Sequence, residues 1–126
     1  MKVFICEQDQ NKARSMEAIL GHRSYKVVTV QRNHDLFKQV SQQRPALIIV
    51  NENFTDNFGI DTINRLKNDP DTSKIPVIYI GKDKKINSDL SAKHSFVEVV
   101  QEPVKIKNLK HYIARWTTLR SLYIKH

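Results

Sequence analysis

The stretch Pro-Ala-Leu-Ile-Ile-Val-Asn-Glu-Asn-Phe, residues 45–54, decides the fold of this chain. Leu47 to Val50 is an uninterrupted apolar run, short and rich in β-branched residues, which predicts a strand buried on both faces. Such strands occur in parallel sheets that helices cover on both sides. In open parallel sheets, functional groups gather just beyond the carboxyl ends of the strands. Here that position holds Asn51, Glu52 and Asn53.

The rest of the chain alternates between apolar runs and helical patterns. The predicted strands are residues 2–6, 25–30, 47–50, 75–80 and 96–100. The predicted helices are residues 11–22, 35–43 and 60–68, a weak helix at best over 87–94, and a last helix from about residue 105. Five β-α units predict a five-stranded parallel sheet with helices on both faces. We expect residues 1–126 to form a single domain of this kind.

The last helix carries one apolar stripe and one polar face. Its predicted inner stripe consists of Ile106, Leu109, Tyr112, Ile113, Trp116 and Leu119. Lys107, Lys110 and His111 lie on the opposite side of the helical wheel. Together with Arg115 they are the residues that we expect to form an interaction face.

Composition places the chain among ordinary globular proteins. Of its 126 residues, 40% are hydrophobic and 27% are charged. No apolar run approaches the roughly 20 residues that span a bilayer. The lone cysteine, Cys6, lies in an apolar strand and is expected to be a buried core residue. We expect a cytoplasmic protein that does not enter a membrane.

The net charge of +8 is unevenly distributed. After Glu102 there is no acidic residue, whereas Lys and Arg occur six times. Such an asymmetry is found in proteins that bind an acidic partner, nucleic acid or an anionic membrane surface. It is equally compatible with a solvated basic face.

Several short motifs occur in a fixed order along the whole chain. They are Glu7-Gln8-Asp9 after the first strand, the Pro45 stretch that ends at Asn51, Gly59 eight positions on, Asp69-Pro70, Ile75-Pro-Val-Ile78 and Glu102-Pro103. By this set the chain resembles the receiver domain of bacterial response regulators. The resemblance implies a flavodoxin-like, CheY-like α/β fold, a doubly wound (βα)5 sandwich with a five-stranded parallel sheet of order 2-1-3-4-5. It also implies a cis bond between Glu102 and Pro103.

The resemblance further implies where a phosphorylation site would lie. In that family a histidine kinase phosphorylates an aspartate after the third strand, and two acids after the first strand hold Mg²⁺. A Ser/Thr after the fourth strand and a Lys after the fifth bind the phosphoryl oxygens, while an aromatic residue in the fifth strand moves. The matching positions are Glu7 and Gln8 (acid pair), Asn51 (phosphoacceptor), Asn53 (carbonyl ligand), Gly81 (Ser/Thr), Val99 (aromatic) and Glu102 (lysine).

The residues at these positions do not suit the family's chemistry. The neutral Asn51 amide is no anionic nucleophile, so no acyl phosphate should form. One carboxylate with amide carbonyls is a poor Mg²⁺ site, and Glu102 would repel a phosphoryl group. We therefore expect no enzymatic activity, no cofactor and at most weak Mg²⁺ binding. Hydrogen bonds among Glu7, Gln8, Asn51 and a lysine such as Lys82 are expected to fill the pocket.

The favoured function is a pseudo-receiver in two-component-type signal transduction, acting as a phosphorylation-independent protein–protein interaction module. Its expected partners are proteins, including a second copy of the chain, bound through the face of the fourth helix, fifth strand and fifth helix. No small-molecule substrate is expected. One alternative is nucleic-acid binding through the last helix with Lys82, Lys84 and Lys85. A second is a weak cation-binding remnant at Glu7 and Glu102.

A flavodoxin-like cofactor binder is a further reading of the same strand pattern. It would need a phosphate-cradling Ser/Thr/Gly loop after the first strand. Residues 7–9 are Glu-Gln-Asp instead, and their charge would repel a phosphate.

Overall fold

The fold is an open α/β sandwich whose strands and helices alternate along the chain. A computed structural model describes residues 1–21, 25–54 and 59–124, without the side chains of residues 33–34 and 119–124. The strands are β1 (Lys2–Cys6), β2 (Lys26–Val30), β3 (Leu47–Asn51), β4 (Val77–Gly81) and β5 (Val97–Gln101). The helices are α1 (Gln10–Leu20), α2 (Asn33–Gln43), the 3₁₀ turn η1 (Glu52–Phe54), α3 (Ile60–Asn68), α4 (Lys84–Lys93) and α5 (Ile106–Ile124).

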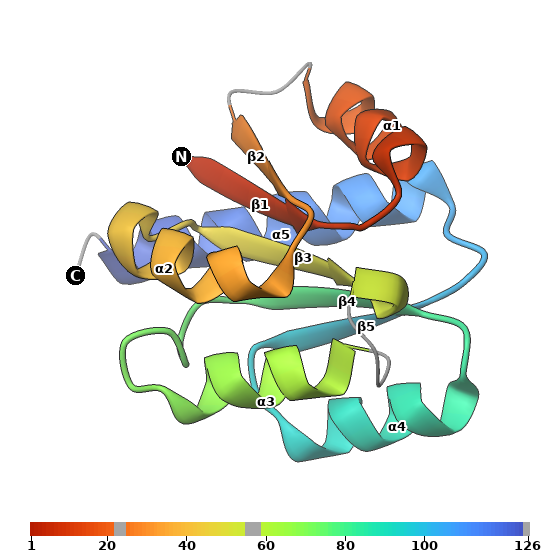
Figure 1. Ribbon diagram of the computed structural model, residues 1–126. Coiled ribbons are helices and arrows are strands. Elements are labelled where there is room, and N and C mark those ends of the chain that lie inside the picture. The colour runs from red at the N-terminus through yellow and green to blue at the C-terminus, as the bar shows by residue number, and fades with distance from the viewer. Residues whose placement is uncertain (22–24, 55–58, 125–126) are drawn as a thin grey trace.

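The five strands form one parallel sheet in the order β2-β1-β3-β4-β5. Helices α1 and α5 cover one face of this sheet, and α2, α3 and α4 cover the other (Figure 1). The predicted fold class and strand order are therefore confirmed. None of the helices among the described residues is long and apolar enough to cross a bilayer.

Alternate residues of the central strands face two separate cores. On the side of α2, α3 and α4 the strand residues are Phe4, Cys6, Ile48, Val50, Val77 and Tyr79. On the side of α1 and α5 they are Val3, Ile5, Leu47, Ile49, Ile78 and Ile80. This two-sided burial explains the unbroken apolar run of β3, because every residue of the strand faces a helix layer. Cys6 is buried as predicted, and burial raises the pKa of its thiol.

The prediction of a weak helix over residues 87–94 was wrong, because α4 is well formed and begins at Lys84. The Asp83 side chain caps it by accepting hydrogen bonds from the backbone N–H groups of Lys85 and Ile86, both at 3.0 Å. This cap turns part of the predicted polar loop into the first helical turn. The spacing of apolar residues did not reveal where α4 begins, because the capping residue Asp83 determines it.

The predicted inner stripe of the last helix also needs correction at its start. Leu109 and Ile113 are buried, and Tyr112 and Trp116 pack against the same core, as predicted. Ile106, however, is 55% exposed. It is the first residue of α5, where the chain has only just left the Pro103 bend, so it lies beyond the part of the helix that packs on the sheet. The Glu102–Pro103 bond is cis, as predicted.

Lys67 ties the end of α3 to the connection that leads into β4. Its ammonium group donates to the carbonyls of Ser73 at 3.1 Å and Ile75 at 2.8 Å. Burial lowers the pKa of Lys67 to about 8 from its ordinary value of 10.5. The folded state therefore loses this proton at a lower pH than the unfolded chain.

The free energy of unfolding should consequently rise as the pH increases from about 8 to about 10.5, and this contribution should be lost again as the pH falls through 8. Urea denaturation of the wild type and of Lys67→Met across this range measures the difference. Lys74→Met, at an exposed position nearby, is the matched control. Parallel pH curves for the wild type and Lys67→Met would contradict the prediction.

Candidate functional site at the carboxyl edge of the sheet

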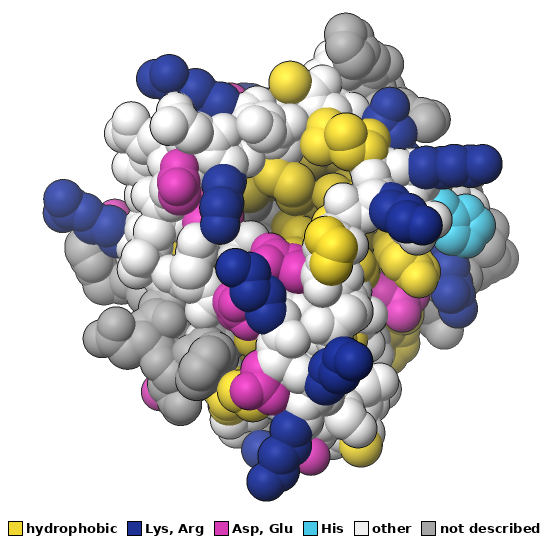
Figure 2. Space-filling model, turned by 90° about the vertical axis from the view of Figure 1, so that its right-hand side faces the viewer, with side chains coloured by type: hydrophobic (Ala, Val, Ile, Leu, Met, Phe, Trp, Pro, Cys, Tyr) yellow, Lys and Arg dark blue, Asp and Glu magenta, His cyan; other side chains and the backbone are white. Residues whose placement is uncertain are grey.

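The strand register brings the predicted site residues to one edge of the sheet. Cys6 pairs with Val50, and Asn51 pairs with Ile80. Gly81 pairs with Gln101. The residues that directly follow these strand ends, among them Glu7 and Glu102, therefore meet at the same edge although they are far apart in sequence. Figure 2 looks onto this edge, where Asp and Glu side chains gather near the centre among Lys and Arg side chains.

Glu7 is the buried carboxylate of the edge, with only 2% of its surface exposed. Its Oε2 accepts a hydrogen bond from the backbone N–H of Asp9 at 3.2 Å. The Asp9 carboxylate in turn caps α1 by accepting from the N–H groups of Asn11 and Lys12. Gln8 is exposed, and its amide donates to the carbonyl of Phe54 at 2.8 Å. Glu7 and Asp9 are thus engaged locally, whereas Gln8 joins the end of β1 to η1.

Asn51 and Asn53 form a short turn directly after β3. The side-chain oxygen of Asn51 accepts from the backbone N–H of Asn53 at 3.3 Å. The side-chain oxygen of Asn53 is buried and has no hydrogen-bond partner among the residues that the structure describes. The Asn51 amide thus stabilises the turn that leads into η1.

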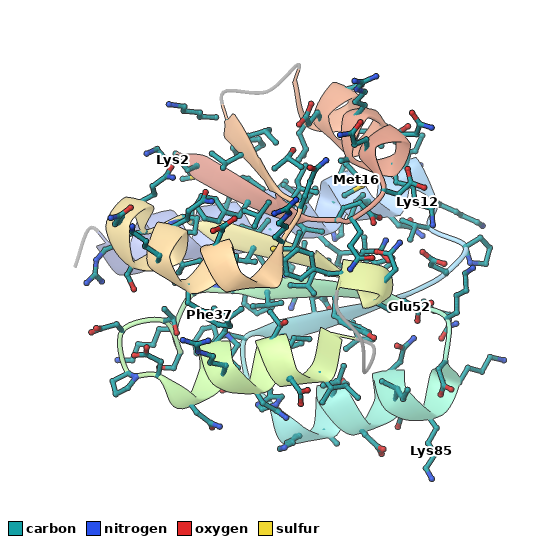
Figure 3. All side chains as sticks on the ribbon, viewed as in Figure 1. Lys2, Lys12, Met16, Phe37, Glu52 and Lys85 are labelled. Carbon is teal, nitrogen blue, oxygen red and sulfur yellow. The ribbon has the colours of Figure 1, made fainter. Side chains whose placement is uncertain are left out.

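A second set of bonds, which we call the edge network, joins the loops after β3, β4 and β5. It consists of Glu52, Lys82, Asn87, Gln101 and Glu102. Glu52, at the end of the sheet in Figure 3, accepts from the Lys82 backbone N–H at 2.8 Å. The Lys82 ammonium lies 3.8 Å from the Glu102 carboxylate. The Lys82 carbonyl accepts from the Gln101 amide at 2.8 Å.

Asn87 completes the edge network from the first turns of α4. Its side-chain NH₂ donates to the Gly81 carbonyl at 3.0 Å and to the Gln101 side chain at 2.9 Å. The Gly81 carbonyl also accepts from the Glu102 backbone N–H at 2.9 Å. Asn87 is 6% exposed, so its bond to the Gly81 carbonyl is shielded from water. Three loops are thereby held together by side chains of the chain itself.

The predicted hydrogen-bond network among Glu7, Gln8, Asn51 and Lys82 is not formed, because these residues have other partners. Each of the first three bonds to nearby backbone or, for Gln8, to Phe54, and Lys82 pairs with Glu102. For Glu7 and Asn51 the physical reason is reach, because the backbone N–H two residues further along is a closer partner than a side chain from another loop.

The sequence pattern placed Glu52 at this edge but did not reveal its bond to Lys82. It gave no role to Gln101, although that residue directly follows a predicted strand. Nothing in the pattern pointed to Tyr79 or Asn87, which depend on the packing of α4.

The two predicted switch positions lie beside a buried tyrosine. Val99 pairs with Tyr79 across β4 and β5, and Gly81 follows Tyr79 by two residues on the same side of β4. Tyr79 is fully buried. Burial, and then the negative charges of Glu52, Asp83 and Glu102, raise the pKa of the Tyr79 phenol. The ring therefore stays neutral, next to an edge that is rich in carboxylates.

The residues of the predicted interaction face lie on both sides of α5. Lys107, His111 and Arg115 are exposed, whereas Lys110 is half-buried. Arg115 lies towards β5, 3.5 Å from the Glu98 carboxylate, which also accepts from the Trp116 indole at 3.3 Å. Lys110 instead lines a small cleft on the α1 side, together with Ile19, Leu20, Tyr25 and Ile113. The structure thus separates Lys110 from Arg115.

Comparisons with known proteins identify the family of this fold and site. The profile of the response regulator receiver domain matches residues 3–114. No curated protein sequence matches the chain at a significant level.

Solved receiver domains share the fold at low sequence identity. The receiver domain of a signal transduction histidine kinase from Syntrophus aciditrophicus has a TM-score of 0.79 and 24% identity, covering 93% of this chain and 89% of that one. A response regulator from Desulfuromonas acetoxidans has a TM-score of 0.79 and 21% identity, covering 94% and 97%. The receiver domain of a sensor histidine kinase from Pseudomonas aeruginosa has a TM-score of 0.78 and 17% identity, covering 93% and 97%, and contains a magnesium ion in its active-site cleft.

The parallel sheet of order 2-1-3-4-5 and the profile match over most of the chain lead to one conclusion: this chain belongs to the CheY-like response regulator receiver family of two-component signalling.

Proposed function

We propose that this chain is a receiver domain that works as a phosphorylation-independent protein–protein interaction module, with no enzymatic activity of its own. The observation that carries the proposal is Asn51, which ends β3 at the position of the phosphoacceptor. Its amide is neutral, and its nitrogen lone pair is delocalised into the carbonyl, so it cannot attack phosphorus as a carboxylate does. The side chain instead holds the turn to Asn53.

Glu102 adds an electrostatic obstacle at the position where the family has a lysine. Its carboxylate is 18% exposed and has Lys82 as its ion-pair partner at 3.8 Å. Two like charges about 4 Å apart repel by about 4 kcal/mol at an effective dielectric constant of about 20. Glu52 and Asp83 carry further negative charge nearby. A phosphoryl group entering this edge would meet repulsion where the family supplies attraction.

The donor set of the edge does not fit the Mg²⁺ ion that receiver domains bind. Mg²⁺ prefers several hard oxygen ligands in octahedral geometry, usually including carboxylates. At the positions that resemble the family's metal site, Glu7 is the one carboxylate, and its Oε2 already accepts from Asp9. The described residues include no group of three or more His, Cys, Asp or Glu side chains placed to hold a metal ion. Weak binding at most, and no resident cofactor, follows from this set.

The edge network supports the proposal from the structural side. In a phosphorylated receiver, the phosphoryl group draws together groups that follow different strands. Here Glu52, Asn87 and Gln101 join the same loops through hydrogen bonds of 2.8 to 3.0 Å. The joined loops therefore need no ligand to hold them.

The surface that we propose for partner binding is the face of α4, β5 and α5, including self-association into a homodimer. Glu98, Arg115 and Trp116 form a connected group there, in which the Arg115 guanidinium lies 5.8 Å from the centre of the Trp116 ring. Phe96 packs against Trp116 at 6.1 Å between ring centroids. Aromatic and arginine side chains of this kind are enriched in protein interfaces. We propose that residues 1–126 form the single domain that carries this face, and that the protein acts in the cytoplasm.

The alternatives receive less support from the geometry. Lys82 is paired with Glu102 and lies beside Glu52, which weakens it as a phosphate-binding residue for nucleic acid. Lys85 extends away from the sheet edge on α4 (Figure 3), so the loop lysines do not form one stripe. Cation binding between Glu7 and Glu102 is disfavoured because both carboxylates already have partners within the chain.

The proposal predicts that the wild-type chain takes up no phosphoryl group from acetyl phosphate in the presence of Mg²⁺. Intact-mass spectrometry measures uptake, and amide NMR spectra with and without beryllofluoride and Mg²⁺ report any bound analogue. A receiver with an aspartate acceptor serves as the positive control under the same conditions. Labelling of this chain, or beryllofluoride-dependent shifts at the carboxyl edge, would refute the proposed function.

A further inference from the structure

Tyr79 occupies the space that a side chain at position 81 would need. An ideal Cβ built on Gly81 would lie 2.6 Å from Cε2 of the Tyr79 ring and 3.2 Å from its Cζ. Real Cβ atoms essentially never come within 3.0 Å of another side-chain atom, and the optimal separation between carbon atoms is about 3.5–4.0 Å. The ring is fully buried in the core that α3 and α4 cover, so it has no free direction in which to withdraw.

Asn87 restricts the same position from a second element. Its Oδ1 would lie 2.6 Å from the Cβ at Gly81. The Asn87 side chain is held in place by the two hydrogen bonds that its NH₂ group donates within the edge network. A hydroxyl side chain at position 81, where the family has Ser or Thr, is thus excluded by groups from both β4 and α4.

The opposite edge of the same ring reaches the turn before α3, in ordinary van der Waals contact. A Cβ at Gly59 would lie 3.6 Å from Cε1 of Tyr79, on the opposite edge of the ring from Gly81. The Tyr79 side chain therefore lies between the starts of α3 and α4. On β5 the residue across from it is Val99, the position of the family's mobile aromatic residue. In this chain the aromatic residue of the pair Tyr79–Val99 is Tyr79 on β4, and its ring is buried.

We propose that Tyr79 is a fixed wedge that, with Gly81 and Asn87, keeps the β4–α4 corner in a single conformation. This inference rests on the proposed function, and it deepens that function by naming what replaces the phosphorylation-driven movement. The Tyr79 ring fills the space on the core side of this corner, and the edge network joins the loops around it. Helix α4 is therefore presented to partners in one position. The interaction face is then permanently set.

A double-mutant cycle tests whether the ring and the glycine are coupled. Gly81→Ala, which adds only the Cβ, is expected to lower the melting temperature by about 5 °C or more, since the wedge leaves no room for it. Tyr79→Leu is expected to lower it as well. The double variant should lose clearly less than the sum of the two single losses, because leucine removes the clash with the ring and leaves only the one with Asn87. Additive losses would overturn the proposal.

Hydrogen exchange tests the conformational part directly. The backbone amides of Lys82 and Glu102, which bond to Glu52 and Gly81, should be protected in the wild type. Tyr79→Leu should reduce their protection about tenfold more than that of amides in β1. Tyr25→Leu, at a half-buried tyrosine on the other face, should leave them unchanged. Equal protection in the wild type and Tyr79→Leu would overturn the wedge.

These measurements separate the wedge from the proposed function. Phosphoryl uptake by the wild type would refute phosphorylation independence, whatever the cycle shows. Additive losses or unchanged protection would refute the wedge, even in a chain that takes up no phosphoryl group.

Discussion

Asn51→Asp alone is expected to leave the chain almost unlabelled by acetyl phosphate, whereas Asn51→Asp combined with Glu102→Lys should label about a hundredfold faster. The first change supplies the missing carboxylate nucleophile. The Glu102 carboxylate would still repel the incoming phosphoryl group by about 4 kcal/mol, which corresponds to a factor of about a thousand in rate before solvent screening. The partial exposure of Glu102 and its ion pair with Lys82 reduce that factor. Intact-mass time courses in Mg²⁺ measure both rates.

The series contains its own controls. Glu102→Gln combined with Asn51→Asp removes the charge at almost constant size, so its rate should fall between the other two. Glu102→Lys alone should take up no label, because it has no acceptor at position 51. Equal labelling of Asn51→Asp with and without the change at Glu102 would show that the charge at this position is not the obstacle.

Phe54→Ala is expected to lower the free energy of unfolding by about 3–5 kcal/mol. Phe54 is the last residue of η1 and is 1% exposed, with its ring in the core that α2, α3 and α4 cover. Its carbonyl also accepts the Gln8 amide, so η1 is anchored both by the ring and by the backbone. Removing the ring leaves a cavity beneath the turn that carries Glu52 and Asn53. Urea denaturation measures the loss.

Phe37→Ala is the matched control for the same chemical change. Phe37 lies on α2 (Figure 3) and is half-buried. The Arg65 guanidinium lies 3.7 Å above its ring. Because the ring is partly in water, its removal should cost about 1–2 kcal/mol. A loss from Phe54→Ala no larger than that from Phe37→Ala would contradict the assigned anchoring role of Phe54.

The sequence pattern predicted the five-stranded parallel sheet, whereas the strand order 2-1-3-4-5 followed from the family resemblance. Leu47 to Val50 is apolar at every position, as expected of a strand buried on both faces, and the alternation of strands with helical patterns then restricts the topology. Element boundaries differed mainly where a cap decided them. Asp83 started α4 three residues before the predicted start, and Ile106 lies outside the packed part of α5.

The sequence could also place Asn51 and Glu102 at the edge of the sheet, since residues after parallel strands meet there. It could not identify their contacts. Lys82 pairs with Glu102 and not with the Asn51 turn, because the register of β4 and β5 sets which loop residues are neighbours. Asn87 is polar and lies in a helix with few apolar residues, so no pattern marks it as buried.

By itself the sequence determined that Asn51 carries an amide and Glu102 a carboxylate, and the proposed loss of phosphorylation rests on the identity of these two groups. Residue identity alone decides these properties. Only the tertiary structure decided that Tyr79 fills the space beside Gly81 and that Glu52, Asn87 and Gln101 join three loops. Steric exclusion and hydrogen bonding between distant segments depend on distances of a few ångströms, and the packing of α3 and α4 against β4 sets those distances.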